Sequence, residues 1–200
     1  MYNDKYIEDL FNNIKNSIVN DVGLAIKAYC SEYHNGNITS GFFAVPRLLL
    51  PEIDGMGAYI TGNVNSTASN IESYLEKIMS KIDDKYSVYA KFISKIYRHG
   101  LLHQHEPKNC KYQGRDAAWS FVVSNPNNPI EIQHKYHLVE NQITFDKSIQ
   151  NPPFVLQTDM TLFYKDVVDS IDRMKQESKT TYRKTFDKAR NEQLKVQILT

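Results

Sequence analysis

Apolar residues recur at intervals of three and four along the first half of the chain, the spacing that places them on one face of an α-helix. Pro46 and Pro51 interrupt this pattern, and each proline removes an amide donor, so we expect a buried helix there that starts late or bends near a proline. Together the segments predict a helical bundle over residues 1–108. The predicted helices are Asp4–Tyr33, a segment within Gly41–Gly62, Ala68–Ile82, and a run that begins at Tyr86.

The second half of the chain has a different pattern. Residues 117–124 form a short segment with aromatic and β-branched side chains, which is typical of a strand. Two prolines among asparagines at 125–129 are typical of a turn. Ile130–Val139 alternates imperfectly, and Ile143–Phe145 is a third candidate, so two or three antiparallel strands are predicted within 117–146. Thr158 and Asp159 then cap a long C-terminal helix over 158–198. We therefore predict one mainly α-helical domain over 1–200, with a small antiparallel β-sheet or hairpin inserted before the C-terminal helix.

Charge and cysteine content exclude several classes of protein. The formal net charge of +1 gives no overall attraction to nucleic acid or membrane, so any such attraction must be local. The two cysteines, Cys30 and Cys110, have no CxxC partner, which argues against a disulfide framework or a zinc knuckle. The amino terminus lacks the pattern of a signal peptide, and the longest apolar stretch is interrupted by charges and prolines. We expect a cytoplasmic protein.

A cluster of ionisable side chains follows the fourth predicted helix. Arg98, His99, His103 and His105 lie within eight residues, with Gly100 inside the group and Pro107 just past it. Because glycine loosens a helix and proline stops one, the cluster is expected at or near a helix end. The spacing of an arginine, a polar residue, three further positions and a histidine resembles the motif of HEPN domains, small helical proteins of which many are ribonucleases. The wider string over residues 98–108 also resembles one found in small, mostly uncharacterised bacterial proteins.

The resemblance implies metal-independent RNA cleavage, with no cofactor and no metal. In that chemistry a ribose 2′-hydroxyl attacks its own phosphate, a histidine moves the proton, and a guanidinium stabilises charge on the phosphorane oxygens. By similarity, His103 is the general acid or base, Arg98 the phosphate clamp, and His99 the residue that positions them. His105 and Lys108 are expected to bind the RNA substrate. HEPN sites are commonly completed by a second copy, so the resemblance also implies a homodimer; residues five apart on one helix point about 140° from each other and converge more easily with a partner chain.

Two other interpretations of the cluster stay open. His99 and His103 have the spacing of a helical metal site, to which His105 or Glu106, and more remotely Cys110, His134 and His137, could contribute. Alternatively, the basic side chains simply satisfy the last carbonyls of their helix, and the protein is a non-catalytic helical scaffold or interaction protein.

Other residues are predicted to have structural roles, with a functional alternative for some. Asp83 and Asp84 are expected to end one helix or cap the next, and Gly55 and Gly57 to let a neighbouring helix approach. Trp119 and Tyr136 are expected in the core, although aromatic residues on strands can also stack on nucleobases. From Arg173 to Lys195 eight Lys and Arg stand against three Asp and Glu, which indicates either a solvated terminal helix or a basic arm for a phosphate backbone or an oligomer partner.

Overall fold

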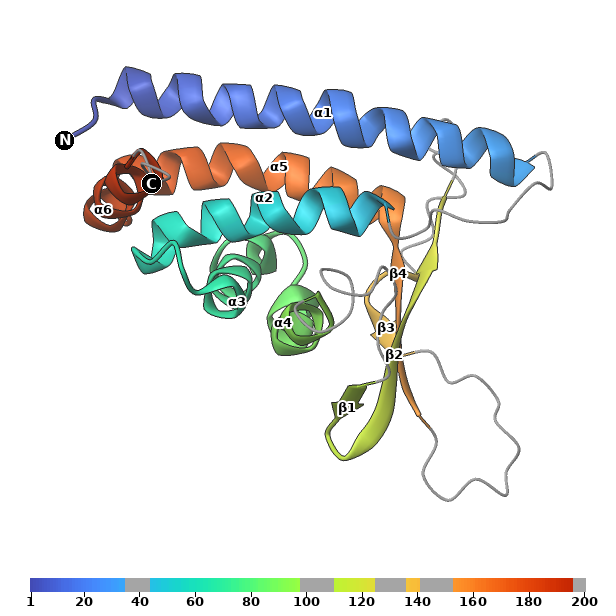
Figure 1. Ribbon diagram of the computed structural model, residues 1–200. Coiled ribbons are helices and arrows are strands. Elements are labelled where there is room, and N and C mark those ends of the chain that lie inside the picture. Colours follow the sequence, from blue (N-terminus) through green and yellow to red (C-terminus); the bar gives the residue numbers. More distant parts are fainter. Residues whose placement is uncertain (35–43, 98–109, 125–135, 141–152, 196–200) are drawn as a thin grey trace, which may run out of the picture.

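The computed structural model is mainly helical, with a small sheet before the C-terminal helices, as predicted. It describes residues 1–34, 44–97, 110–124, 136–140 and 153–195, and the side chains of 29–34 and 110 fall outside this description. Within these ranges the chain forms six α-helices, one short 3-10 helix and four strands. Figure 1 shows the helices stacked beneath α1, with the sheet at one end of the bundle and α6 at the other.

The N-terminal helices confirm the periodic pattern. The third predicted helix ends early, and a 3-10 turn, η1, continues it to Lys81. The fourth begins one residue before Tyr86, and its predicted continuation past Tyr97 lies outside the described residues. The helices are α1 (Asp4–His34), α2 (Ala44–Thr61), α3 (Thr67–Lys77), η1 (Met79–Lys81) and α4 (Lys85–Ile96).

Both prolines of the second segment lie inside α2. Pro46 is in its first turn, where a missing amide costs no helical hydrogen bond, and Pro51 is in its interior. Of the two glycines predicted to permit close packing, Gly57 does so: a Cβ at this position would lie 2.1 Å from the carbonyl oxygen of Asn70 on α3. Gly55 has open space around it. The α2–α3 contact therefore depends on Gly57.

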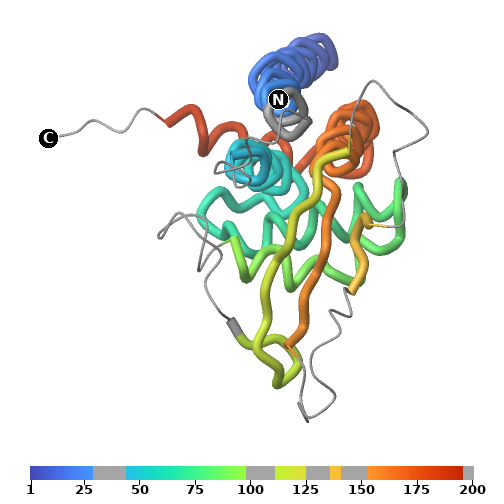
Figure 2. The backbone as a smooth tube through the Cα atoms, turned by 90° about the vertical axis from the view of Figure 1, so that its right-hand side faces the viewer, coloured from blue at the N-terminus to red at the C-terminus, as the bar shows by residue number. Residues whose placement is uncertain are grey.

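The sheet has four strands in the order β1-β2-β4-β3 and mixed directions. The strands are β1 (Cys110–Tyr112), β2 (Arg115–Val122), β3 (Val139–Glu140) and β4 (Phe154–Asp159). The two outer pairs are antiparallel, as predicted, but the central strands β2 and β4 are parallel, with Ala117 opposite Phe154 and Val122 opposite Asp159. Figure 2 looks onto the sheet and shows these two strands side by side in front of the helices.

The strand predictions are correct in part. Residues 117–122 form β2, but β1 and β4 were not predicted, and β4 occupies the residues just before the predicted cap at Asp159. Of the predicted strand 130–139, residues 130–135 lie outside the described residues, residues 136–138 are not in a strand, and Val139 begins β3. Leu138 has a positive φ of 50°, which is not a strand conformation. The strand candidate at 143–145 lies outside the described residues.

A single apolar core joins the bundle to the sheet. An aromatic group of α4, β1 and β4 makes this contact, with the ring centroids of Phe92 and Phe154 5.0 Å apart and those of Tyr112 and Phe154 4.9 Å apart. Trp119 is also buried, and its indole N–H donates to Thr158 Oγ1 over 2.7 Å. Trp119 is therefore a core residue, as the structural interpretation predicted, whereas Tyr136 is exposed.

The C-terminal region contains two helices where one long helix was predicted. Asp159 caps α5 (Met160–Lys179) by accepting from the amides of Thr161 and Leu162, which confirms the predicted cap. The chain then turns at Thr180–Tyr182 into α6 (Arg183–Gln193), whose Phe186 and Ala189 are buried.

Several cations of this basic region are paired within the protein. Lys179 Nζ lies 2.5 Å from Glu8 of α1, and Arg183 Nη1 lies 2.7 Å from Asp4. Arg190 donates to the hydroxyl of Tyr6 over 2.8 Å. These contacts tie α5 and α6 to the start of α1, so much of the basic region serves to hold the fold together.

Candidate functional site

The residues of the predicted RNA site lie just beyond the described end of α4. Arg98, His99, His103, His105 and Lys108 all fall within 98–109, outside the described residues. The alternative metal ligands Glu106, in the same range, and His134, in 125–135, also lie outside them. The last described residues before this segment, Ile96 and Tyr97, are 1% and 3% exposed. The chain therefore enters the motif from a firmly packed helix end.

Charged groups of two helices flank this end of α4. Burial raises the pKa of Tyr97 to about 12, the nearby negative charge of Asp54 adds to this effect, and the positive charge of Arg47 opposes it. Arg47 and Asp54 belong to α2, and Arg47 is exposed. Lys95, in the last turn of α4, donates to the carbonyl of Lys111 in β1 over 3.0 Å. Two cations thus lie near the position where the motif begins.

The other end of α4 carries a polar cluster built from three separate elements. Tyr86 of α4 donates to Asp166 Oδ2 of α5 over 2.8 Å. His137, two residues before β3, places its Nε2 3.0 Å from the Tyr86 oxygen and 3.4 Å from the same Asp166 oxygen. We call these three residues the Tyr86 cluster.

The Tyr86 cluster is buried. The side chain of His137 is 2% exposed and that of Asp166 is 15% exposed, while Tyr86 is fully enclosed. Burial raises the pKa of Tyr86 well above its usual value, and the negative charges of Asp166, Asp83 and Asp159 raise it further. Tyr86 therefore keeps its proton and acts as a hydrogen-bond donor.

The second ring nitrogen of His137 connects the cluster to Asp159, the cap of α5. Because the Asp159 carbonyl can only accept, His137 Nδ1 donates to it over 3.2 Å. The Asp159 carboxylate also accepts from Ser124, two residues after β2, through both the Ser124 hydroxyl and its amide. Asp159 thus contacts both Ser124, which follows β2, and His137, which precedes β3.

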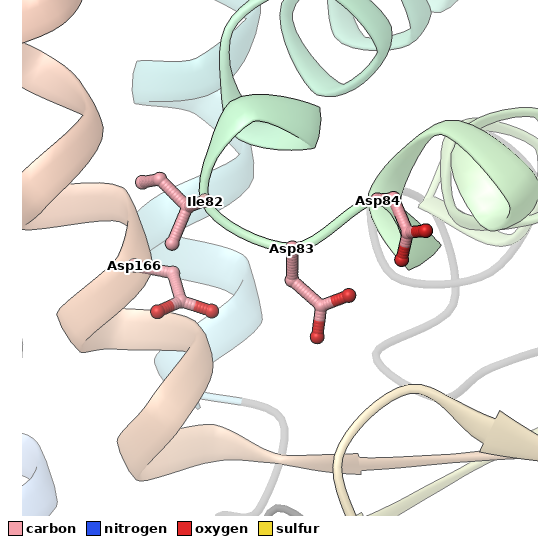
Figure 3. Close-up of a pocket in the computed structure, with 4 residues that line it drawn as sticks. All are labelled: Ile82, Asp83, Asp84 and Asp166. Atoms are coloured by element: carbon pink, nitrogen blue, oxygen red, sulfur yellow. The ribbon is translucent and has the colours of Figure 1, made fainter.

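A cavity of about 420 Å³ lies beside the Tyr86 cluster, lined by Ile82, Asp83, Asp84 and Asp166. Figure 3 shows that Asp166 comes from α5, whereas the other three come from the turn before α4. Asp83 Oδ1 accepts from the amide of Lys85, so this residue caps the start of α4 as predicted. Asp84 occupies the N-cap position without a side-chain capping bond.

The geometry of the Tyr86 cluster does not form a metal site. Both ring nitrogens of His137 are engaged with Tyr86 and Asp159. Across the residues that the structure describes, no group of three His, Cys, Asp or Glu side chains is arranged to hold a metal ion. In this arrangement His137 therefore has no free ring nitrogen with which to bind a metal ion.

Comparisons with known proteins found no family model, no curated protein and no solved structure that matches this chain. In the part of the chain that the structure describes, no helix is long and apolar enough to cross a membrane.

The predicted site follows one end of α4 in the sequence, whereas the polar cluster at the other end was not predicted. The Tyr86 cluster joins residues 51 and 80 positions apart in sequence, and no local motif connects them. The only signal was the apolar setting of His137, between Tyr136 and Leu138, which is unusual for a solvent-facing histidine.

Proposed function

We propose that this protein binds and cleaves single-stranded RNA without a metal ion, as a homodimer of HEPN-like type. Arg98, His99 and His103 are the proposed catalytic residues, and His105 and Lys108 the proposed substrate-binding residues. His103 moves the proton of the ribose 2′-hydroxyl, and Arg98 stabilises the charge that develops on the phosphate.

The observation that carries this proposal is the burial of the last turn of α4. A catalytic arginine and histidine need a rigid support, because misplacement by about 1 Å costs orders of magnitude in rate. Ile96 and Tyr97 provide this support immediately before Arg98, within a helical bundle of the kind in which the HEPN motif occurs.

Local charge also supports a phosphodiester substrate. The exposed Arg47 lies near Tyr97, and Lys95 belongs to the last turn of α4. Lysine and arginine side chains supply most of the affinity of proteins for nucleic-acid backbones. The near-neutral net charge of the chain is compatible with this role because the cations need to gather only at the site.

The test is cleavage of a single-stranded RNA oligonucleotide by the full chain and by His103→Ala, each with and without a chelator. We expect the wild type to cleave equally well with chelator and His103→Ala to be at least about 100-fold slower, the usual contribution of a general acid or base. Lys184→Ala is the matched control, since this exposed cation belongs to α6, at the opposite end of the bundle from the sheet, and should cleave normally.

Three results would contradict the proposal. Cleavage by His103→Ala at the wild-type rate removes the catalytic assignment, and loss of cleavage with chelator removes the metal-independent mechanism. A wild-type protein that neither cleaves nor binds RNA leaves the non-catalytic interaction protein as the remaining interpretation.

A further inference from the structure

All the charged side chains of helix α4 are positive. The helix contains three lysines and no aspartate or glutamate. It buries Ala90, Ile93 and Ile96 in the core, whereas Lys91 and Lys95 lie on the opposite side and are exposed. Figure 1 shows α4 on the side of the bundle away from α1, beside the sheet. This helix therefore presents a basic surface to solvent.

The two exposed lysines of α4 are neighbours on the helix surface. Because Lys91 and Lys95 are four residues apart, they are separated by about 6 Å along the helix axis. Lys95 is also held in place, since its ammonium group donates to the carbonyl of Lys111 in β1 over 3.0 Å. An ammonium group has three donors, so Lys95 keeps two of them for an anion.

Strand β1 extends the basic surface from α4 to the sheet. The ring of Tyr112 packs against Phe92 of α4, with the ring centroids 5.2 Å apart. Because successive side chains of a strand point to opposite faces, Lys111 points away from this contact, and it is exposed. We call Lys91, Lys95 and Lys111 the lysine track.

Acidic side chains leave the lysine track largely uncompensated. Among the residues that the structure describes, no ion pair includes a member of the track. Glu72, on the adjoining α3, accepts from the hydroxyl of Ser94 over 2.7 Å. Asp116 of β2 lies opposite Lys111 in the β1–β2 register, but the two side chains form no ion pair.

The basic residues of α5 and α6 are used differently. Lys175, Lys179 and Arg183 are each paired with a carboxylate of the same chain. Two of these pairs reach α1, so their charge serves the packing of the helices. The charge of the lysine track has no such internal use and remains for an anion outside the protein.

We propose that the lysine track binds the phosphate backbone of a single-stranded RNA that crosses the carboxyl half of α4 and continues to β1. The inference rests on the proposed function, from which it takes the RNA substrate, and it adds the path of the strand beyond the cleaved bond. The spacing of Lys91 and Lys95 is close to that of neighbouring phosphates in an extended strand, and a further phosphate binds Lys111. On α4 the track ends three residues before Arg98 in the sequence.

The test is the affinity of the protein for a short, fluorescently labelled single-stranded RNA, measured by fluorescence anisotropy at a series of salt concentrations. All variants are made in His103→Ala, so that the RNA stays intact. We expect Lys91→Gln and Lys111→Gln each to reduce the slope of log affinity against log salt by about 0.7, and the two together by about 1.4. Lys95 is left unchanged because it also holds β1.

Two controls separate charge from structure. Lys91→Arg keeps the positive charge and should keep the slope of the parent protein. Lys184→Gln removes an exposed cation of α6, at the opposite end of the bundle from the sheet, and should also leave the slope unchanged. A single-stranded DNA of the same sequence should show the same reductions as the RNA, because phosphate contacts do not read the sugar.

The outcomes distinguish the track from the proposed function. Unchanged slopes in Lys91→Gln and Lys111→Gln, together with RNA cleavage by the wild type, would overturn the track and leave the catalytic proposal in place. Reduced slopes in both variants, together with a wild type that does not cleave RNA, would support the track and remove the catalytic proposal. Reductions with RNA but not with DNA would overturn the assignment of these lysines to phosphates.

Discussion

At its amino end α4 begins beside the carboxylates of Asp83, Asp84 and Asp166, whereas its carboxyl end carries Lys95 and lies near Arg47. Both arrangements suit the helix dipole, which favours negative charge at the start of a helix and positive charge at its end. The ends differ in how their polar groups are used. At the amino end Tyr86, His137 and Asp166 are satisfied mainly by one another and are buried, whereas at the carboxyl end the exposed Arg47 acts on Tyr97, the residue that precedes Arg98 in the sequence.

Charged residues at a helix end therefore say little about function until their hydrogen-bond and ion-pair partners are known. A histidine bonded to a tyrosine and an aspartate would pass for a catalytic group on composition alone, yet His137 is 2% exposed and cannot reach a substrate in this form. The proposed RNA chemistry thus belongs to the segment that follows the carboxyl end of α4, whereas the polar cluster at the amino end stabilises the fold. Substitutions at either end of α4 can separate these two roles.

The largest effect is expected from mixing two inactive variants. If Arg98 and His103 act across a dimer, Arg98→Ala and His103→Ala are each inactive, but a mixed dimer holds one intact pair. After subunit exchange, half of the dimers are mixed and each has one of two sites, so about a quarter of wild-type cleavage should return. Cleavage that stays at the level of the separate variants would show that each chain builds its own site.

Removal of the buried hydroxyl should chiefly affect stability. Tyr86→Phe leaves Asp166 and His137 without their shared partner, and a buried group that loses its hydrogen bond costs about 1–3 kcal/mol. Urea denaturation measures this loss. Tyr89→Phe, on the same helix but partly exposed, is the control and should change stability little.

Alkaline pH should separate the two ends of α4 again. Burial raises the pKa of Tyr86 well above the usual value for tyrosine, and it raises the pKa of Tyr97 to about 12. The unfolded chain loses these protons near pH 10, so between about pH 10 and 12 the folded state binds more protons and stability falls by up to about 1.4 kcal/mol per pH unit for each tyrosine. Replacement by phenylalanine should remove part of this loss, and more for Tyr86 than for Tyr97. Urea denaturation of both variants across this range measures it; equal slopes in wild type and variants would contradict the assignment.

The smallest effect is expected from Arg47→Ala. One lost phosphate contact should reduce the slope of log affinity for single-stranded RNA against log salt by about 0.7, while the cleavage rate at saturating RNA stays near that of the wild type. Lys184→Ala should leave the slope unchanged. An unaltered slope for Arg47→Ala would place the RNA path away from α2.

The fold was predictable where the pattern was local. The three-and-four spacing predicted α1 nearly to its ends, α2 within its segment and the start of α4, and Asp159 was correctly predicted as a cap. Strand β4 was missed because it is short, follows two prolines and runs directly into its helix, so its apolar residues resemble a helix start. Its parallel pairing with β2 depends on contacts 37 residues apart, and no local signal encodes them. Strand β1 was missed although Gln113-Gly114, with φ of 51° and 78°, forms the two-residue turn that a Gly in second position favours.

The candidate sites divide in the same way. The Arg98–His103 motif is a matter of local spacing and can be read from the chain, but the pairing of Tyr86 with His137 and Asp166 requires the fold. Trp119, which packs against Phe163 next to Tyr86, was predicted as a core residue from its place in an aromatic, β-branched segment. Burial is thus easier to predict from sequence than the partners of a buried polar group.

The central claim, that the two ends of α4 have separate roles, is tested most directly by measuring RNA cleavage and the free energy of unfolding for His103→Ala and Tyr86→Phe in parallel. We predict that His103→Ala loses cleavage and keeps the stability of the wild type, whereas Tyr86→Phe loses about 1–3 kcal/mol and cleaves normally at a temperature where it is folded. A folded Tyr86→Phe that no longer cleaves, beside a His103→Ala that does, would contradict the account.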